Sequence, residues 1–292
     1  MSITAAMVKE LRERTGSGMM ECKKALSEAG GDLDAAVELM RKAGLAKADK
    51  KSGRTTAEGR VSARVSADGK NAVIIEVNCE TDFVAKGDDF VAFVDDVAEC
   101  ALASGAETLE ALLEAPMKGS TVEQIRRELV AKIGENIAVR RHALFQSDAG
   151  QIGSYLHGTR IGVLVELHGG DADLGKDVAM HVAACSPVCC DETGVAPELI
   201  AREKDIFSAQ AEASGKPANI IEKMVEGRIK KYLGEITLTG QPFVKDPDQT
   251  VGQVLKSKSA SAIRFVRFEV GEGIEKEESN FAEEVMAQVR AS

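Results

Sequence analysis

The chain has 292 residues, of which 44% are hydrophobic and only 6 are proline, so a globular protein of two or three domains is expected. Its net charge of −10 and its lack of tryptophan argue against a direct nucleic-acid binder, because such proteins present basic patches and stacking aromatics. No apolar run approaches the ~20 residues of a membrane span, and the first residues lack the basic and apolar regions of a signal peptide. We expect a cytoplasmic protein with no membrane contact.

Residues 4–44 carry the pattern of three short helices. Thr4, Ser17 and Asp32 each stand where an N-cap is expected before apolar residues at helical spacing. A basic segment with glycine and serine, 47–54, follows as a linker. Residues 1–54 carry 11 Lys and Arg against 8 Asp and Glu, whereas the whole chain is acidic. We therefore predict a docking domain at 1–54, a three-helix bundle of the ubiquitin-associated type, by analogy at the level of fold only.

From Arg60 the period of the apolar residues changes from helix to strand. The predicted elements of this first core subdomain, 55–145, are a strand around Val61–Val65, a turn at Asp68-Gly69, a return strand from Ala72 that ends at Asn78, helices at about Asp88–Ala103 and Val122–Ile133, and a strand at Ile137–Phe145. Alternating and continuous apolar strands with helices between them indicate an antiparallel α+β unit.

The same order recurs in a second core subdomain, 146–270. Its predicted elements are a strand at Ile161–Leu167, a helix at Leu174–Cys185 and a strand at Ile263–Val270, while Thr250-Val-Gly-Gln resembles the earlier Thr121-Val-Glu-Gln. We predict a duplicated antiparallel α+β core. An insertion at about 191–235 is predicted to be a helical hairpin of two periodic segments, Glu198–Ala213 and Asn219–Leu233. A C-terminal helical module, 271–292, is predicted to begin its helix at Asn280.

Two strings imitate known sites. Gly170–Asp177 follows a strand and opens a helix, as a P-loop does, but Asp177 stands where Ser or Thr must hold Mg²⁺, and two further acids would repel phosphates. His181, Cys185 and Cys189 are four residues apart, but Pro187 interrupts the helix and no fourth ligand is evident. We expect buried thiols, one hydrogen-bonded histidine and no metal or cofactor.

Residues 76–86, Glu-Val-Asn-Cys-Glu-Thr-Asp-Phe-Val-Ala-Lys, place a carboxylate and a large aromatic side by side. The pattern predicts a buried strand, a short polar turn with Asp82 and Phe83, and then a helix. A charge and a wedge on such a turn suit insertion into a partner protein. The ordinary alternative is that Phe83 is buried at the start of the helix and Asp82 caps it.

This string resembles a signature of the elongation factor Ts family. Further similar pieces are the run Leu11–Leu26, Lys132–Asn136, Gly227–Lys231, Thr239–Phe243 and Val270–Lys276, so the resemblance covers nearly the whole chain. It implies a nucleotide-exchange factor for the GTPase elongation factor Tu, with no enzymatic reaction of its own. It also implies that Thr81, Asp82, Phe83 and Val84 contact Tu near the helices that flank its Mg²⁺ and phosphate site.

Two other groups are candidate contacts. Met19 and Met20 are neighbours on a helix and diverge by about 100°, so one of them should be exposed. The alternative places both in the bundle core. The resemblance favours contact of Met19, Met20 and Lys23 with the GTPase domain of Tu, and contact of His157 with Tu away from the nucleotide.

Two rival functions remain open at this point. A P-loop nucleotide-binding enzyme would use the string Gly170–Asp177. A ubiquitin-associated-type adaptor would use the N-terminal bundle, but it leaves the string 76–86 without a role. The helical hairpin is expected either to pair two complexes or merely to pack on itself.

Overall fold

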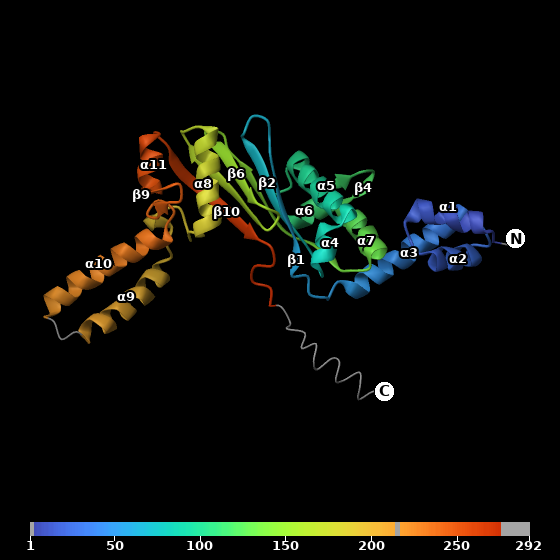
Figure 1. Ribbon diagram of the computed structural model, residues 1–292, viewed down its shortest axis with the longest axis horizontal. Coiled ribbons are helices and arrows are strands. Elements are labelled where there is room, and N and C mark those ends of the chain that lie inside the picture. Colours follow the sequence, from blue (N-terminus) through green and yellow to red (C-terminus); the bar gives the residue numbers. More distant parts are fainter. Residues whose placement is uncertain (1–2, 214–216, 276–292) are drawn as a thin grey trace.

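The computed structural model describes residues 3–213 and 217–275, which form an elongated molecule of helices and antiparallel sheets (Figure 1). Three helices stand at the N-terminal end, two three-stranded sheets with covering helices occupy the middle, and two long helices project at the opposite end. The α+β class expected from the sequence is confirmed.

The N-terminal bundle consists of α1 (Ala5–Thr15), α2 (Met19–Glu28) and α3 (Leu33–Lys51). Thr4 caps α1 and Asp32 caps α3 through side-chain oxygens that accept backbone amides of the first turn, as predicted. The core of the bundle is formed by buried side chains from all three helices, Val8, Leu11, Cys22, Ala25, Leu26 and Ala36.

Two details of the bundle differ from the prediction. The N-cap of α2 is Gly18 instead of Ser17, and no side chain caps that helix. Helix α3 continues through most of the predicted linker and ends only at Lys51. The extra turns are stabilised by the body of the protein: Ala48 is 3% exposed within the core of the first unit, and Asp49 pairs with Arg127 at 2.5 Å.

The first unit of the body is a sheet with strand order β1-β2-β5. Strands β1 (Glu58–Val65) and β2 (Asn71–Cys79) form the predicted hairpin, and β5 (Ile137–Gln146) pairs with the other edge of β2. Between β2 and β5 the chain forms α4 (Asp82–Lys86), α5 (Asp88–Ser104), α6 (Leu109–Glu114), β3 (Pro116–Met117), β4 (Ser120–Thr121) and α7 (Val122–Ile133). The longer helices cover one face of this sheet.

The second unit repeats this topology with β6 (Gln151–His157), β7 (Ile161–His168) and β10 (Ser261–Glu269) in the order β6-β7-β10. Between β7 and β10 the chain forms α8 (Ala172–Cys185), a 3₁₀ turn (Glu192–Gly194), α9 (Pro197–Glu212), α10 (Ala218–Ile236), β8 (Pro242–Phe243), β9 (Asp246–Thr250) and α11 (Val251–Ser257). In both units a small two-stranded hairpin ends in a threonine that caps the next helix. The predicted duplication is confirmed.

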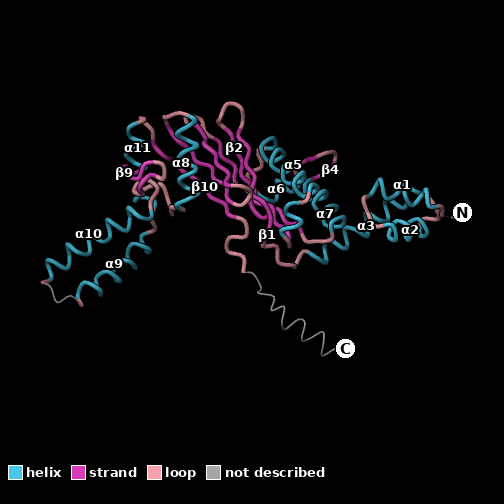
Figure 2. Tube along the Cα trace, viewed as in Figure 1, coloured by secondary structure: helices cyan, strands magenta, loops and turns pink. Residues whose placement is uncertain are grey.

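The two sheets pack face to face in the middle of the molecule (Figure 2). Side chains along β2 alternate between two cores, because successive residues of a strand point to opposite faces. Val73 and Ile75 face the helices of the first unit, whereas Ala72 and Ile74 face Leu164 and other residues of the second sheet. The body therefore has four layers, with helices outside and two sheets inside.

Each central strand carries a buried glutamate that pairs with an arginine on its neighbour. Glu76 on β2 accepts a hydrogen bond from Arg141 Nε at 2.6 Å. Glu166 on β7 accepts one from Arg264 Nε at 2.7 Å. Both glutamates are the sixth residue of their strand, so the two pairs are equivalent positions of the duplicated unit.

The same arginines also join the two sheets to each other. Arg141 lies 4.2 Å from the ring centre of Phe268, and Arg264 lies 4.2 Å from that of Phe145. Each arginine thus stacks on a phenylalanine of the opposite unit. In each unit the phenylalanine follows the arginine by four residues along the same strand. This exchange gives the interface an approximate twofold symmetry and fixes the sheets relative to each other.

The predicted helical hairpin is confirmed as α9 and α10, which project from the second unit (Figure 1). The two helices are joined by an edge-to-face contact of Phe207 with Tyr232, whose ring centres are 6.3 Å apart, and Arg228 stacks on Phe207 at 5.9 Å. Ile206 and Ile220 remain exposed on the hairpin. The two helices therefore support each other and leave apolar side chains in solvent.

Residues 276–292, which include Asn280 and the predicted C-terminal helix, lie outside the described residues. The described chain leaves the sheets through Gly271, whose amide donates to Glu76 at 2.8 Å. Within the described part of the chain, no helix combines the length and apolar character needed to cross a membrane.

Candidate functional site

The segment after β2 forms the short helix α4, not the polar turn predicted from the sequence. Thr81 is its N-cap, and the Thr81 hydroxyl accepts a hydrogen bond from the amide of Val84 at 3.4 Å. The preceding strand runs one residue further than predicted, to Cys79. Phe83 is 82% exposed on the first turn of α4. This exposure excludes the alternative in which Phe83 is an ordinary core residue.

Although Phe83 lies in solvent, the helix that carries it is anchored to the body. Ala85 is buried in the core of the first unit, and Val84 packs against that core. Arg60 Nη1 donates a hydrogen bond to the carbonyl of Ala85 at 3.3 Å. A large apolar side chain held in water by a fixed backbone is typical of a protein–protein contact.

Asp82 lies beside Phe83 and forms an ion pair with Lys86, one turn further along α4, at 2.6 Å. The hydrogen bond from Lys86 holds the pKa of the Asp82 carboxyl below its usual value. The carboxylate is therefore charged at neutral pH. It does not cap the helix, because Thr81 does.

Two glutamates that were not singled out in the sequence hold the loop in front of α4. Glu135, which follows α7, accepts hydrogen bonds from the Thr81 amide at 3.0 Å and from the Thr81 hydroxyl at 2.7 Å. In return, Glu80 accepts a hydrogen bond from the amide of Asn136 at 2.6 Å. We call this exchange of hydrogen bonds the clasp. Its two halves lie in the strings 76–86 and Lys132–Asn136, both of which resembled the family, but neither string indicated that the two meet.

His157 is exposed at the end of β6, with its Nδ1 atom 3.2 Å from the Tyr155 hydroxyl. The turn that follows is tied to the first unit, because Arg160 pairs with Glu58 at 3.0 Å. Glu58 lies opposite Cys79 in the sheet, just before α4. His157 and α4 therefore lie at the same end of the two sheets.

The methionines of α2 form a separate patch on the bundle, well away from α4 (Figure 1). Met19 is 58% exposed and Met20 is 76% exposed, so the expectation that only one is exposed is wrong. Both occupy the first turn of α2, before Cys22 begins its buried face. Lys23 is exposed nearby. The candidate residues thus form separate surfaces along the molecule.

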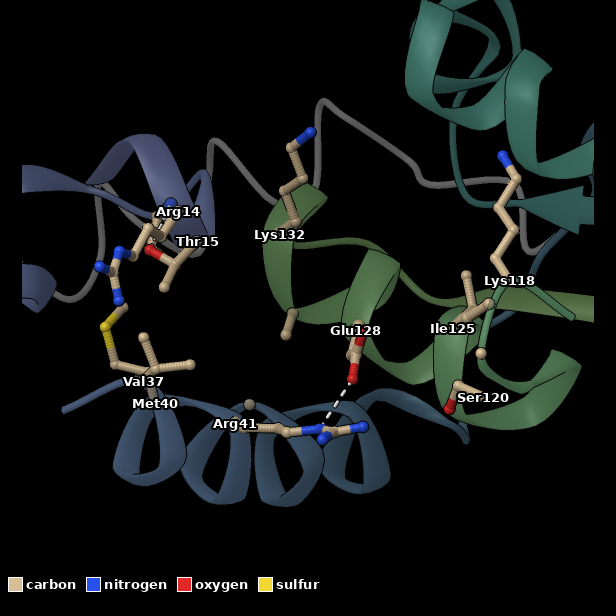
Figure 3. Close-up of a pocket in the computed structure, with 14 residues that line it drawn as sticks. Arg14, Thr15, Val37, Met40, Arg41, Lys118, Ser120, Ile125, Glu128 and Lys132 are labelled. Carbon is tan, nitrogen blue, oxygen red and sulfur yellow. Dashed lines mark hydrogen bonds and ion pairs between the residues drawn. The ribbon is translucent and has the colours of Figure 1, made fainter. Parts of the chain in front are cut away.

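A cleft of about 440 Å³ lies between the bundle and the body (Figure 3). Its wall from the body is formed by α7 and the β3–β4 turn, and its wall from the bundle by α1 and α3. The cations that line the cleft are paired within the chain: Arg14 with Asp34 at 3.0 Å, Arg41 with Glu128 at 2.9 Å, Lys118 with Asp96 at 2.5 Å and Lys132 with Asp89 at 2.7 Å. Among the described residues that line the cleft, these arginines and lysines thus have partners already, which does not favour an anion site.

The P-loop-like string Gly170–Asp177 does not form a phosphate-binding loop. Asp171 is the N-cap of α8, so Gly175 and Lys176 lie inside the helix instead of in a loop around a ligand. A Cβ atom on Gly175 would lie 3.1 Å from the Cα of Gly153. Gly175 is therefore explained by the close crossing of α8 over β6. The string no longer supports the hypothesis of a P-loop enzyme.

The histidine of the metal-like string already has partners at both ring nitrogens. His181 is buried, and its Nδ1 accepts from the amide of Val244 at 3.1 Å while Nε2 donates to Gln241 Oε1 at 2.9 Å. Burial lowers the pKa of His181, so the ring is neutral. Cys185, expected to be buried, is exposed because α8 ends there. In the described part of the chain, no group of three or more metal-ligating side chains comes together.

Comparison with known proteins gives one family along the chain. The family model described as Elongation factor TS matches residues 80–272. The chain is 78% identical to Elongation factor Ts of Methylococcus capsulatus and 62% identical to Elongation factor Ts of Alkalilimnicola ehrlichii, in both cases over 100% of each chain. It is 57% identical to Elongation factor Ts of Hydrogenovibrio crunogenus, over 100% of this chain and 99% of that protein. The chain therefore belongs to the elongation factor Ts family of translation elongation factors.

Proposed function

We propose that this protein is a guanine-nucleotide exchange factor that binds elongation factor Tu and promotes release of GDP. The observation that carries the proposal is Phe83, 82% exposed on an anchored helix beside the charged Asp82. The family resemblance of residues 76–86 implies that this pair enters Tu near the helices flanking its Mg²⁺ and phosphate site. Displacement of those helices weakens the binding of Mg²⁺ and phosphate without any attack on the nucleotide.

Exchange of this kind is a linkage between two binding sites on Tu. A protein that binds nucleotide-free Tu more tightly than nucleotide-bound Tu must weaken the binding of the nucleotide to Tu by the same ratio. To change the ratio of nucleotide-bound to nucleotide-free Tu from 99:1 to 1:99, the factor must bind the nucleotide-free form more tightly by roughly 5.5 kcal/mol. One side chain does not supply this, so several surfaces must share it.

The separate exposed surfaces match this requirement. Met19, Met20 and Lys23 on the bundle form one contact with the GTPase domain of Tu, and Phe83 with Asp82 forms the second. His157, at the same end of the sheets as α4, forms a third contact away from the nucleotide. Thr81 and Val84, which flank Asp82 and Phe83 on α4, contribute to the second contact. The exposed hairpin is available to pair two complexes.

The proposed activity requires no catalytic residue, metal or cofactor of this chain, and it takes place in the cytoplasm. A release assay tests it directly. Tu loaded with fluorescently labelled GDP is mixed with excess unlabelled GDP, with and without a substoichiometric amount of the protein, and the loss of signal is followed. We expect the protein to accelerate release and to turn over many Tu molecules.

The same preparation, incubated with labelled GTP in the absence of Tu, separates this function from that of a nucleotide-binding enzyme. We expect no binding of GTP to the isolated protein. Binding of GTP by the protein alone, together with an unchanged rate of GDP release from Tu, would contradict the proposal.

A further inference from the structure

The helix that presents Phe83 is too short to be stable by itself. Helix α4 has five residues, whereas isolated helices shorter than ~12 residues are marginal in water. Its backbone includes a hydrogen bond from the Ala85 amide to the Thr81 carbonyl at 3.2 Å. The position of Phe83 must therefore be set by contacts from outside the helix.

The clasp supplies such contacts at the N-cap. The Glu135 carboxylate accepts two hydrogen bonds from Thr81, one from the amide and one from the hydroxyl, and the same hydroxyl oxygen accepts from the Val84 amide. Glu135 thus orients the capping side chain and its backbone together. Hydrogen bonds to a carboxylate are stronger than neutral ones, so this contact fixes the direction in which α4 starts.

The position of Glu135 depends on a glycine. Gly134 ends α7 with φ +90°, a left-handed conformation that residues with a Cβ atom rarely adopt. The chain reverses there and brings Glu135 to the end of β2. Residues 81 and 135 are 54 positions apart, so the contact exists only in the folded body.

The same loop is tied to the end of the bundle. Asn136 is 4% exposed, and its side-chain amide donates to the carbonyls of Ser52 at 3.3 Å and Arg54 at 2.9 Å. Lys51 Nζ, at the end of α3, donates to the carbonyl of Gly134. The loop 134–136 therefore contacts both the helix that leaves the bundle and the cap of α4.

We propose that Glu135 is a positioning residue for nucleotide release, and that its clasp with Thr81 holds α4 so that Phe83 is a preformed wedge before Tu binds. The inference rests on the proposed exchange function and assigns a role within it. Glu135 acts through Thr81 and α4 and needs no contact with Tu. A wedge whose backbone is fixed in advance loses less conformational entropy when it enters its partner.

The test compares Glu135→Ala with Glu135→Gln and with a matched control, Glu123→Ala. The glutamine keeps one oxygen for the Thr81 amide. Glu123 is also a partly buried glutamate, but its carboxylate pairs with Arg126 within α7. In the labelled-GDP assay we expect release to slow about tenfold for Glu135→Ala, by about threefold for Glu135→Gln and by less than about twofold for Glu123→Ala.

A double variant distinguishes positioning from general loss of structure. If Glu135 acts through Phe83, Glu135→Ala will slow release little further in a Phe83→Ala protein, although its effect on the melting temperature will remain. The clasp proposal is overturned if Glu135→Ala matches Glu123→Ala in release. It is also overturned if Glu135→Ala slows the Phe83→Ala protein by the same factor as the wild type.

Hydrogen exchange of the free protein supplies a readout that does not involve Tu. We expect the Ala85 amide to exchange about tenfold faster in Glu135→Ala, with core amides of β2 unchanged. Equal protection of Ala85 in both proteins overturns the clasp. A different outcome separates the two proposals. If the wild-type protein does not accelerate GDP release from Tu, but the Ala85 amide still exchanges faster in Glu135→Ala, the exchange function is wrong and the role of the clasp in fixing α4 is retained.

Discussion

The two units of the body share one topology but differ in what they carry. After β2 the first unit inserts α4, with its exposed Phe83, whereas after β7 the second unit passes through Gly169 and Gly170 directly into α8. The first unit also packs against α3 of the bundle, and the second carries the projecting hairpin. The shared elements thus build the scaffold, and the unshared elements present the candidate contact surfaces other than His157, which ends the shared strand β6.

The paired glutamates show a second difference between the units. Glu76 is fully buried and accepts hydrogen bonds from four donors: the Arg140, Arg141 and Asn78 side chains and the Gly271 amide. Glu166 is 6% exposed, and its partners are Arg264 and Ser147, with His168 at 3.9 Å. We therefore expect the stability of the first unit to depend more on its buried glutamate than that of the second.

The largest expected effect is on stability and compares these equivalent positions. Glu76→Ala should lower the free energy of unfolding by about 3–5 kcal/mol, because it leaves two arginines without their buried partner. Glu166→Ala should cost about 1–2 kcal/mol, since Arg264 is nearly half exposed and can turn to water. Urea unfolding of both variants measures the difference. Equal losses would show that the units are energetically symmetric.

Acid titration sharpens the same comparison. Burial alone would raise the pKa of Glu76, but hydrogen bonds from the Gly271 amide, Arg141, Arg140 and Asn78 outweigh it and lower that pKa below 4.5. The unfolded chain then binds the proton more readily than the folded one. The stability from this ionised group is complete above pH 4.5 and is lost as the pH falls below it. Glu76→Gln should flatten the stability profile in that window.

The next effect concerns α4, which the second unit lacks. Phe83→Ala should lower the affinity for nucleotide-free Tu by ~2 kcal/mol or more, with matching loss of GDP release. Its melting temperature should stay near that of the wild type, because the ring is 82% exposed. The matched control is Phe90→Ala, a fully buried residue of the adjacent α5, which should lose about 3–5 kcal/mol of stability. A large drop in melting temperature for Phe83→Ala would refute the wedge.

Truncations test how the bundle joins the first unit. Removing residues 1–31, which contain α1 and α2, should weaken binding to Tu and leave the unfolding midpoint of the body unchanged. Removing residues 1–54 should also lower the stability of the body, by about 2 kcal/mol, because Ala48 and the ion pair of Asp49 with Arg127 belong to the first unit. Calorimetry of the two truncated proteins measures this. Equal midpoints would mean that α3 adds nothing to the body.

The smallest expected effect on exchange lies in the hairpin of the second unit. Replacing Ile206 and Ile220 by serine should change GDP release by less than about twofold, since both side chains are exposed and distant from α4. If the hairpin pairs complexes, light scattering of the Tu complex will show a smaller particle. Phe207→Ala is the control that disturbs contact between α9 and α10. Loss of exchange in the folded double-serine protein would assign the hairpin a direct action on Tu.

The sequence alone determined most of the local structure. Apolar periodicity and capping residues predicted α5, α7, α8 and the hairpin helices to within a few residues, because these patterns record which face of each element is buried. The recurrence of Thr-Val-x-Gln at the start of α7 and α11 indicated the duplication. The run 76–86 also indicated the family and singled out Asp82 and Phe83 as candidate contacts.

Only the tertiary structure decided how those residues are presented. The sequence did not show that Met19 and Met20 are both exposed, or that the linker continues α3, because both depend on which surfaces the neighbouring elements cover. The clasp joins Thr81 to Glu135 across 54 positions, so no local pattern encodes it. Packing of α7 on the sheet brings these two loops together, and that packing gives a five-residue helix a fixed direction.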